Sequence, residues 1–257
     1  MRFASLGSGS QGNALVVEVA RTCLMLDCGF SLRETVSRLA RVGLEPSDLS
    51  GIIVTHEHAD HGEGVFPLAS RFGIPVWLTH GTLAALRETG ARADEECSFN
   101  LIDAQRGFSV GDVLVQPFTV PHDAREPVQY VLSDGASRLG VLTDTGCSTA
   151  HIESTLSGCD ALVIECNYDS NMLTSGPYPA ALKTRIASRL GHLDNRTSGE
   201  ILEGLDRSRL KHVIAAHLSQ TNNTPELARG ALAEVLHCEP RWISVATQDE
   251  GFAWREL

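Results

Sequence analysis

Short runs of apolar residues recur along the chain, and most are bounded by glycine, proline, asparagine or aspartate. Runs of about four to eight apolar residues between such turn-forming residues are typical of β-strands. The sequence therefore predicts strands at residues 2–6, 14–19, 23–27, 52–55, 75–78, 113–118, 128–132, 139–143, 161–165 and 213–216.

Apolar residues at helical spacing lie between several of these strands. In residues 31–41, Ser31 is placed to cap a helix, and Glu34 completes the spacing of a capping box. Gly43 is expected to end this helix, because glycine commonly follows the last helical turn. Further helices are expected at residues 82–88, 178–190, 198–205 and 224–236.

The order of these elements predicts the fold class. Strands come first in two blocks, and helices close each block, so the order is not a strict βαβ alternation. It favours two mixed sheets packed face to face with helices outside, a four-layer α/β/β/α sandwich, over a doubly wound sheet. We find no repeat or linker and expect one domain over residues 1–257. Residues 167–179 form the longest irregular stretch expected and are a candidate cover for a site.

Composition limits the class of protein. At 257 residues and 42% hydrophobic content, the chain can bury a sizeable core. It has no long apolar run and its first five residues do not resemble a signal peptide, so we expect a cytoplasmic protein with no membrane partner. The seven cysteines include no C-x-x-C pair, which indicates neither a disulfide framework nor a cysteine zinc site. The net charge of −11 argues against broad adhesion to nucleic acid, but not against a local basic patch.

One short segment carries an unusual concentration of metal-binding side chains. Residues 56–61 read His-Glu-His-Ala-Asp-His directly after an apolar run. Imidazole and carboxylate are ligands that borderline divalent metals prefer, and crowding four of them is costly unless a cation offsets their repulsion. A helical His-Glu-x-x-His zinc site is excluded, because position 60 is Asp60. The segment predicts a metal site; the alternative is a solvated, histidine-rich loop.

Three further polar residues end predicted strands. His122 follows residues 113–118, Asp144 follows 139–143 and His217 follows 213–216. Strand ends at one rim of a sheet converge, so we expect these residues to meet the segment at 56–61. Taken singly, each also fits a residue that merely terminates a strand.

This arrangement resembles the metallo-β-lactamase superfamily. The matching features are H-x-H-x-D-H after an apolar strand, a separate histidine, an aspartate in T-D-T-G and a final histidine at a strand end. The resemblance implies the sandwich fold of that superfamily and two divalent metal ions, Mn²⁺ or Zn²⁺, with iron as a further candidate. It assigns His56, His58 and His122 to one metal, Asp60, His61 and His217 to the other, and Asp144 to a bridge between them.

A narrower resemblance is to the YycJ (WalJ) branch of that superfamily. It is carried by motifs at residues 5–13, 26–31, 176–179, 191–193 and 217–223. Members of that branch are 5′ to 3′ DNA exonucleases with a two-metal site, linked to mismatch repair. The resemblance implies a nucleic acid substrate, DNA with a 5′ end, and DNA-repair proteins as partners. Tyr168 and Asp194 depart from the pattern, since the branch more usually has histidine and serine there.

Two residues are expected to act in catalysis. Asp60 would orient the attacking hydroxide while binding a metal; the alternative is an N-cap of a helix starting near Gly62. His192 is a candidate general acid or phosphate donor, because imidazole can do either near neutral pH. The alternative for His192 is a histidine at the C-terminus of the preceding helix.

Two segments are expected to contact substrate. Residues 7–13 offer unhindered N–H groups together with Ser8, Ser10 and Asn13, which suits an oxyanion nest for a terminal phosphate. The alternative is a plain tight turn. Lys183 and Arg185 are candidates to neutralise backbone phosphates, or else belong to a solvated helix surface.

These observations predict a two-metal phosphodiester hydrolase, in first place a 5′–3′ DNA exonuclease acting in DNA repair. One alternative is a metal-dependent hydrolase of a small thiolester, lactone or phosphodiester, similar to glyoxalase II, because the same metal ligands serve several activities. The other is a metal-stabilised scaffold without hydrolytic activity.

Overall fold

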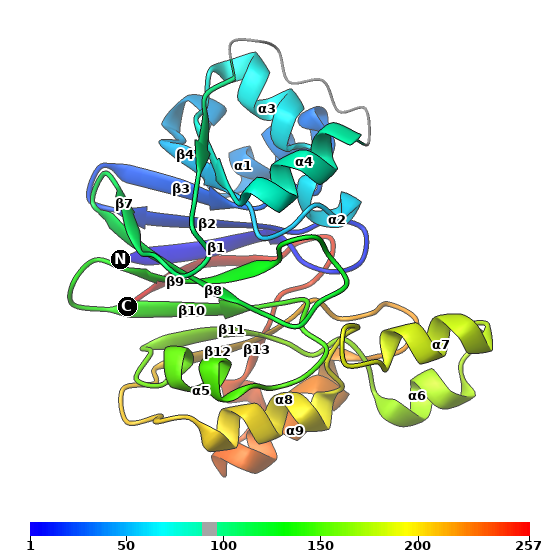
Figure 1. Ribbon diagram of the computed structural model, residues 1–257. Coiled ribbons are helices and arrows are strands. Elements are labelled where there is room, and N and C mark those ends of the chain that lie inside the picture. The colour runs from blue at the N-terminus through cyan, green and yellow to red at the C-terminus, as the bar shows by residue number, and fades with distance from the viewer. Residues whose placement is uncertain (89–96) are drawn as a thin grey trace.

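The computed structural model describes residues 1–88 and 97–257. Within them, two seven-stranded sheets pack face to face (Figure 1). The first sheet has the order β14 (Phe252–Glu256), β1 (Arg2–Gly7), β2 (Ala14–Val19), β3 (Thr22–Leu26), β4 (Gly51–Ile53), β5 (Val76–Leu78) and β6 (Phe99–Leu101). The second has the order β13 (Ser244–Val245), β12 (His212–Ala216), β11 (Ala161–Glu165), β10 (Arg138–Leu142), β9 (Val128–Ser133), β8 (Val113–Thr119) and β7 (Phe108–Val110).

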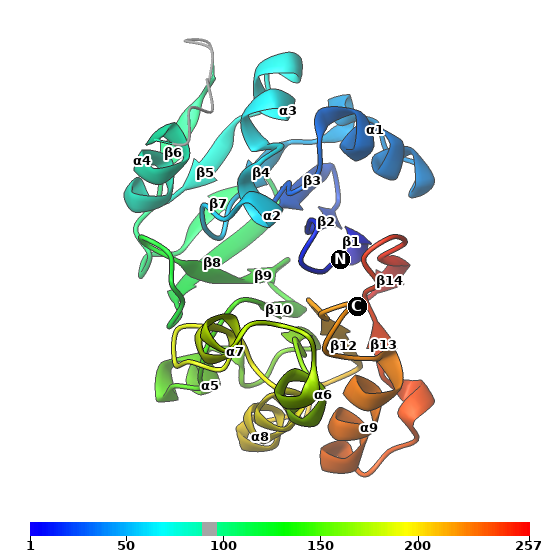
Figure 2. The same ribbon diagram turned by 90° about the vertical axis from the view of Figure 1, so that its right-hand side faces the viewer.

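Helices cover the outer face of each sheet (Figures 1 and 2). On the first sheet lie α1 (Leu32–Arg41), α3 (Val65–Phe72) and α4 (His80–Glu88). On the second lie α5 (Ala150–Leu156), α8 (Asn195–Gly204) and α9 (Pro225–Leu236). The short α2 (Ala59–Gly62) lies at the rim, and α6 (Ser170–Ser175) and α7 (Ala180–Ile186) project beside it. The predicted four-layer α/β/β/α sandwich is confirmed. None of the described helices has the length and apolar character needed to cross a membrane.

Strands that are apolar on both faces hold the four layers together. On β2, Leu15 and Val17 pack between the sheets, whereas Val16 packs towards the helices. On β11, Val163 faces the other sheet and Ile164 faces the helices. Side chains alternate along a strand, so a continuous apolar run buries both faces and fixes the register.

The strand directions bring one set of strand ends together. β3 and β4 are parallel, as are β10, β11 and β12. β8 runs in the same direction as β10, because both are antiparallel to β9. The carboxyl ends of these strands therefore lie at one rim of the sandwich, where the predicted metal ligands follow them in sequence.

Every predicted strand and helix is present, but several elements were not predicted. Of these, β6, β7 and β13 have three residues or fewer, too few to show an alternating pattern. Residues 167–179 are not irregular throughout, because α6 lies within them and buries only Leu173. The helix expected at 178–190 is shorter, since α7 ends at Ile186. Apolar periodicity cannot mark helices this short and exposed.

Candidate metal centre and active site

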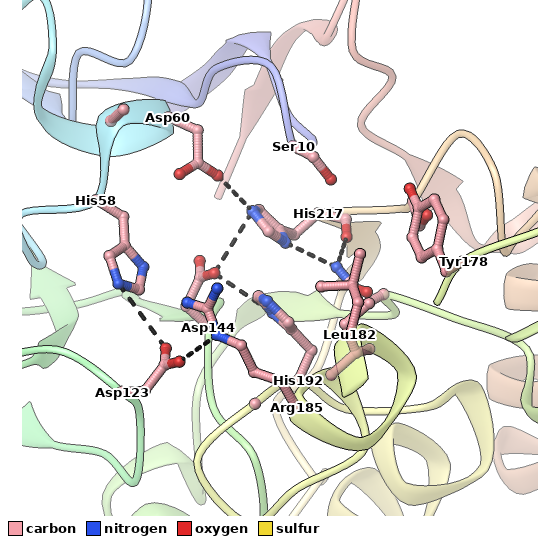
Figure 3. Close-up of a pocket in the computed structure, with 15 residues that line it drawn as sticks. Ser10, His58, Asp60, Asp123, Asp144, Tyr178, Leu182, Arg185, His192 and His217 are labelled. Carbon is pink, nitrogen blue, oxygen red and sulfur yellow. Dashed lines mark hydrogen bonds and ion pairs between the residues drawn. The ribbon is translucent and has the colours of Figure 1, made fainter. Parts of the chain in front are cut away.

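The seven predicted metal ligands meet at the rim of the sandwich. Four of them, His58, Asp60, Asp144 and His217, line a pocket of about 380 Å³ (Figure 3). The turn from β4 through α2 supplies four of the seven, and the carboxyl ends of β8, β10 and β12 supply one each. Their nitrogen and oxygen atoms form groups close enough to share a metal ion. The ligands predicted are His56, His58, Asp60, His61, His122, Asp144 and His217.

The first ligand group consists of three imidazoles. Nδ1 of His58 lies 3.1 Å from Nε2 of His56 and 3.2 Å from Nε2 of His122. Two nitrogen ligands at about 2.1 Å from one metal are separated by about 3.0–3.4 Å in octahedral or tetrahedral geometry. The spacing of these three nitrogens therefore suits a common ion.

Outer hydrogen bonds set the orientation of two of these rings. Nδ1 of His122 donates to the carbonyl oxygen of Gly191 over 3.1 Å, because a carbonyl can only accept. The Thr55 hydroxyl donates to Asp27 and is then free to accept from Nδ1 of His56 at 2.9 Å. In both rings the unprotonated Nε2 faces the centre of the group, as a metal ligand requires.

The second ligand group combines imidazoles with carboxylates. Nε2 of His217 lies 3.3 Å from Oδ2 of Asp60, and Nε2 of His61 lies 3.6 Å from the same oxygen. Asp144 reaches both groups, since its Oδ1 is 3.5 Å from Nε2 of His217 and 3.9 Å from Nε2 of His122. A carboxylate in this position can bridge two ions.

One contact in this group is unfavourable without a cation. Nε2 of His61 lies 3.0 Å from Oδ2 of Asp144, yet this buried oxygen has no hydrogen-bond partner, because the two groups are not aligned. Nδ1 of His61 is 2.8 Å from Asp27 and donates to it. Burial lowers the pKa of His61, but the carboxylates around it, first that of Asp144, raise it well above its usual value. A positive charge between Nε2 and Asp144, a proton or a metal ion, is therefore favoured. The residues present fit divalent metal ions.

The electrostatics of the cluster also favour cations. Burial alone would raise the pKa of Asp144, but the imidazoles of His217 and His61 hold it well below its usual range. Burial lowers the pKa of His217, but neighbouring carboxylates, first that of Asp144, raise it to about 10. Burial and the nearby His61 keep the pKa of His56 well below its usual range. The site holds ionised carboxylates in a buried position, and metal ions and protons compete for them.

The backbone at the rim is unusual at three positions. Asp27, Asp144 and His217 have positive φ angles of 59°, 52° and 54°. A non-glycine residue in this left-handed region is strained, and such residues cluster at functional sites. Asp27 and His217 directly follow β3 and β12, and Asp144 lies two residues after the end of β10, so each sharp turn directs a side chain into the cluster.

His192 forms a close pair with a buried carboxylate. Its Nδ1 lies 2.7 Å from Oε1 of Glu165 and 3.5 Å from Oδ1 of Asp144. Burial would raise the pKa of Glu165, but His192 lowers it, so the ionised carboxylate accepts the Nδ1 proton. Burial lowers the pKa of His192, but the charge of Glu165 raises it above its usual value. His192 lines the pocket and is suited to donate a proton from its other nitrogen.

Two carboxylates that orient site histidines were not predicted from the sequence. Glu165 is the last residue of β11 and contacts His192, and Asp27 directly follows β3 and contacts His61. Both have the feature that identified Asp144, a polar residue at the carboxyl end of a buried strand. Applied to every predicted strand, that rule would have found them.

The predicted substrate residues divide into two sets. Ser10 and Arg185 line the pocket. Ser8, Asn13 and Lys183 do not, and Nζ of Lys183 donates instead to the carbonyl oxygen of Thr174 over 2.7 Å.

The loop before β2 is hydrogen-bonded to the backbone of the metal-ligand cluster. Ser8 accepts a hydrogen bond from the His217 N–H over 2.9 Å and donates to Asn13 over 3.1 Å. Asn13 accepts from the N–H of Gly9 and donates to the carbonyl oxygen of Asp60. These groups already have protein partners, and a role of Ser8 and Asn13 in cradling a terminal phosphate stays a prediction. They fix the backbone of two metal-ligand candidates.

Arg185 is held at the mouth of the pocket by an ion pair. Its Nε donates to Oδ2 of Asp123 over 2.7 Å, and Oδ1 of Asp123 lies 3.8 Å from Nε2 of His58 (Figure 3). Asp123 therefore connects the long cationic side chain of Arg185 to the edge of the first ligand group. A substrate phosphate at this edge would meet the guanidinium directly.

Several alternatives from the sequence are decided by the geometry. Asp60 is not an N-cap, because α2 begins at Ala59 with His58 in the cap position. His192 does not end a helix, since it lies between α7 and α8. Tyr168 and Asp194, which depart from the YycJ (WalJ) pattern, do not line the pocket; Asp194 caps α8 by accepting from the Thr197 N–H.

Comparison with known proteins agrees with this geometry. The chain belongs to the beta-lactamase superfamily, because the family model described as "Beta-lactamase superfamily domain" matches residues 22–217. Within it, the chain is 35% identical over 238 residues to exodeoxyribonuclease YycJ of Bacillus anthracis, covering 92% of this chain and 89% of that protein. It is 33% identical over 236 residues to exodeoxyribonuclease WalJ of Streptococcus pneumoniae serotype 2 (strain D39), covering 91% and 88%. The predicted resemblance to the YycJ (WalJ) branch is confirmed.

Solved structures share the fold at low sequence identity. The metallo-beta-lactamase fold protein YhfI from Bacillus subtilis has a TM-score of 0.79 at 14% identity and covers 100% of this chain and 98% of its own. Zn²⁺-bound PqqB from Methylobacterium extorquens has a TM-score of 0.75 at 19% identity and covers 100% of both chains. These likenesses support the sandwich architecture alone.

Proposed function

We propose that this protein is a metal-dependent exodeoxyribonuclease that hydrolyses DNA from a 5′ end with two divalent ions at the rim. The position of Asp144 carries the proposal, since its carboxylate oxygens lie 3.0–3.9 Å from ligand nitrogens of both groups. Paired metal sites with a shared ligand are well suited to phosphodiester hydrolysis. Relatives that match about nine-tenths of the chain are named exodeoxyribonucleases, which supports DNA as the substrate.

The proposed assignment follows the two ligand groups. His56, His58 and His122 would hold one ion, Asp60, His61 and His217 would hold the other, and Asp144 lies near both groups. Ions bound there lower the pKa of water and neutralise charge on the phosphodiester. We further propose Mn²⁺ or Zn²⁺ as the ions, with iron as the next candidate, because this mixed ligand set accepts all three.

Three side chains act on the substrate in this proposal. Asp60 is anchored through its carbonyl oxygen by Asn13 and accepts a hydrogen bond from the attacking water. His192 protonates the departing 3′-oxygen from Nε2 of its imidazolium form, which the hydrogen bond from Nδ1 to Glu165 stabilises. Arg185 exchanges its partner Asp123 for a phosphate of the DNA.

The experiment is release of mononucleotides from a 5′-phosphorylated duplex by protein loaded with each metal in turn. The expected result is stepwise release of nucleoside 5′-monophosphates, abolished in Asp144→Asn. S-lactoylglutathione serves as the comparison substrate for a thiolester hydrolase. Absence of nucleotide release with every metal, or faster turnover of the thiolester than of DNA, would overturn the proposal.

The cellular role proposed is DNA repair in the cytoplasm, in company with repair proteins that generate or present 5′ ends. Complementation of a strain lacking the gene tests this role directly. We expect wild type to restore the normal mutation frequency and Asp144→Asn to leave it elevated. Equal complementation by Asp144→Asn would instead support a scaffold without hydrolytic activity.

A further inference from the structure

One side of the pocket is apolar, although its floor is made of histidines and carboxylates. Tyr178, Leu182 and Ile186 contribute this side. Figure 3 shows Tyr178 and Leu182 across the pocket from His58 and Asp123. A substrate bound here therefore meets charged groups on one side and flat or branched apolar groups on the other.

The segment that carries these three side chains contributes little to the core of the protein. α7 contains no buried residue, and α6 and α7 project from the sandwich rather than covering a sheet (Figures 1 and 2). The ring of Tyr178 is half-buried, and among the described residues its hydroxyl has no hydrogen-bond partner. Leu182 and Ile186, one helical turn apart, are also half-buried at the pocket. These side chains are available to a ligand.

The same segment is fixed at both ends to the candidate active site. At its start, the Asp169 N–H donates to the carbonyl oxygen of Asn222 over 2.8 Å. At its end, the His192 N–H donates to the carbonyl oxygen of Ile186 over 2.9 Å. A side chain on Gly191 would collide with that same carbonyl, so glycine permits the close approach. The apolar side is thus held at a defined position relative to His192.

Local sequence also restricts Tyr178. It lies between Pro177 and Pro179, and the residue before a proline is confined largely to extended conformations. Pro179 itself is fixed at φ −57° and ψ 148°. Tyr178 loses little further freedom when it packs against a ligand, which is the property expected of an aromatic binding platform.

We propose that Tyr178 is the platform on which the base of the released nucleotide stacks, with Leu182 and Ile186 beside it. The inference rests on the proposed function and names the part of the nucleotide that this side of the pocket recognises. A nucleotide joins an anionic phosphate to a flat base, and the pocket places a cation-binding floor beside an aromatic ring. Stacking tolerates any base, which suits an enzyme that removes nucleotides in succession. The pocket volume of about 380 Å³ is at the small end for ligand sites and suits one nucleotide.

The first test compares 5′-phosphorylated duplexes that end in an ordinary nucleotide or in a tetrahydrofuran abasic residue. We expect Tyr178→Ala to lower kcat/KM by about 5- to 150-fold on the ordinary end, the range for loss of one base–aromatic stack. On the abasic end its effect is expected to be less than about twofold. Tyr178→Phe, which keeps the ring, is expected to stay close to wild type on both substrates.

A matched control is Leu190→Ala, which removes an exposed apolar side chain from the turn after α7 and outside the pocket. It is expected to behave as wild type on both substrates. Equal losses by Tyr178→Ala on the two substrates would indicate a structural role and overturn the proposal. So would full activity of Tyr178→Ala on the ordinary end.

A binding measurement separates this proposal from the proposed function. In Tyr178→Trp, deoxyadenosine 5′-monophosphate is expected to quench the new indole, whereas 2-deoxyribose 5-phosphate is not. Wild type provides the background, because Trp77, Trp242 and Trp254 lie outside the pocket. If wild type releases no nucleotide from DNA, the proposed function fails while quenching still decides the stacking. Equal quenching by both phosphates, or none by either, would refute the platform.

Discussion

Nδ1 of His192 and Oε1 of Glu165 are joined by a hydrogen bond of 2.7 Å at the side of the metal-ligand cluster. Glu165 is fully buried and does not line the pocket, so any effect on a substrate passes through the residues that it contacts. It therefore acts as a positioning residue, which fixes the ring of His192 and raises its pKa.

Replacing Glu165 should change the pH dependence of turnover. Glu165 raises the pKa of His192, so wild type keeps the protonated acid to a higher pH. In Glu165→Gln that support is lost, and the alkaline limb of the kcat profile should move to lower pH. The profile is measured at saturating DNA, with metal content checked by elemental analysis. An alkaline limb at the wild-type position in a metal-loaded variant would argue against this coupling.

Removing His192 itself should be rescued by a better leaving group. We expect His192→Asn to lower kcat by about 10²–10⁴-fold on ordinary DNA, the usual contribution of a general acid. A substrate with sulfur in place of the bridging 3′-oxygen departs without a proton, so most of this loss should disappear. Rates on the two substrates are compared in single-turnover experiments. If the variant is equally impaired on both, His192 has another role.

Variants at Asp144 and at Asp60 should differ in the number of metal ions that the protein retains. Asp144 contacts both ligand groups, whereas Asp60 contacts only the group of His61 and His217. We expect Asp144→Asn to weaken both sites and Asp60→Asn to weaken one. Elemental analysis after dialysis against a known free metal concentration measures the stoichiometry. Identical stoichiometries in the two variants would contradict a bridging position for Asp144.

Chelation should lower the thermal stability of the protein. The cluster places the buried Asp144 close to the partly buried Asp60, and a bound cation offsets the repulsion between the two carboxylates. At a free metal concentration of about 100 times Kd, binding adds about 2.7 kcal/mol to the free energy of unfolding. For a chain of this size that corresponds to a Tm shift of about 5–10 °C. Calorimetry with and without chelator checks it, and Asp144→Asn should show a smaller shift.

The two cations of α7 should contribute unequally to DNA binding. Arg185 lines the pocket, whereas Lys183 is bonded to Thr174 and points away from it. We expect Arg185→Gln to raise KM for DNA and to reduce the slope of log KM against log salt by about one. Lys183→Gln is the matched control and should leave both near wild type. Equal effects would indicate a diffuse charge interaction with the helix.

The sequence was sufficient to predict the layers of the fold and the group of candidate metal ligands. Long apolar strands such as residues 113–118 have enough positions to show their pattern, and residues 56–61 concentrate metal-binding side chains locally. The edge strands and α6 beside the pocket were missed, because two to six residues carry too little periodicity. Their positions depend on tertiary contacts that a local pattern does not contain.

The hardest roles to predict were those that depend on where a side chain points and which groups it contacts. Ser8, Ser10 and Asn13 lie within one short loop, yet only Ser10 reaches the pocket, because Ser8 and Asn13 bond to neighbouring backbone. Glycine content predicted the turn but not which N–H groups were already occupied. Glu165 was visible as the last residue of a strand, and only its contact with His192 shows what it does.

The left-handed backbone at Asp144 and His217 has a consequence for laboratory evolution. Glycine adopts this conformation freely, whereas other residues lose about 1 kcal/mol or more there. Selection of variants for heat resistance in the presence of a chelator should therefore enrich glycine at these two positions and produce more stable proteins without metal ligands. Any programme to make this chain more robust has to screen for turnover at each round.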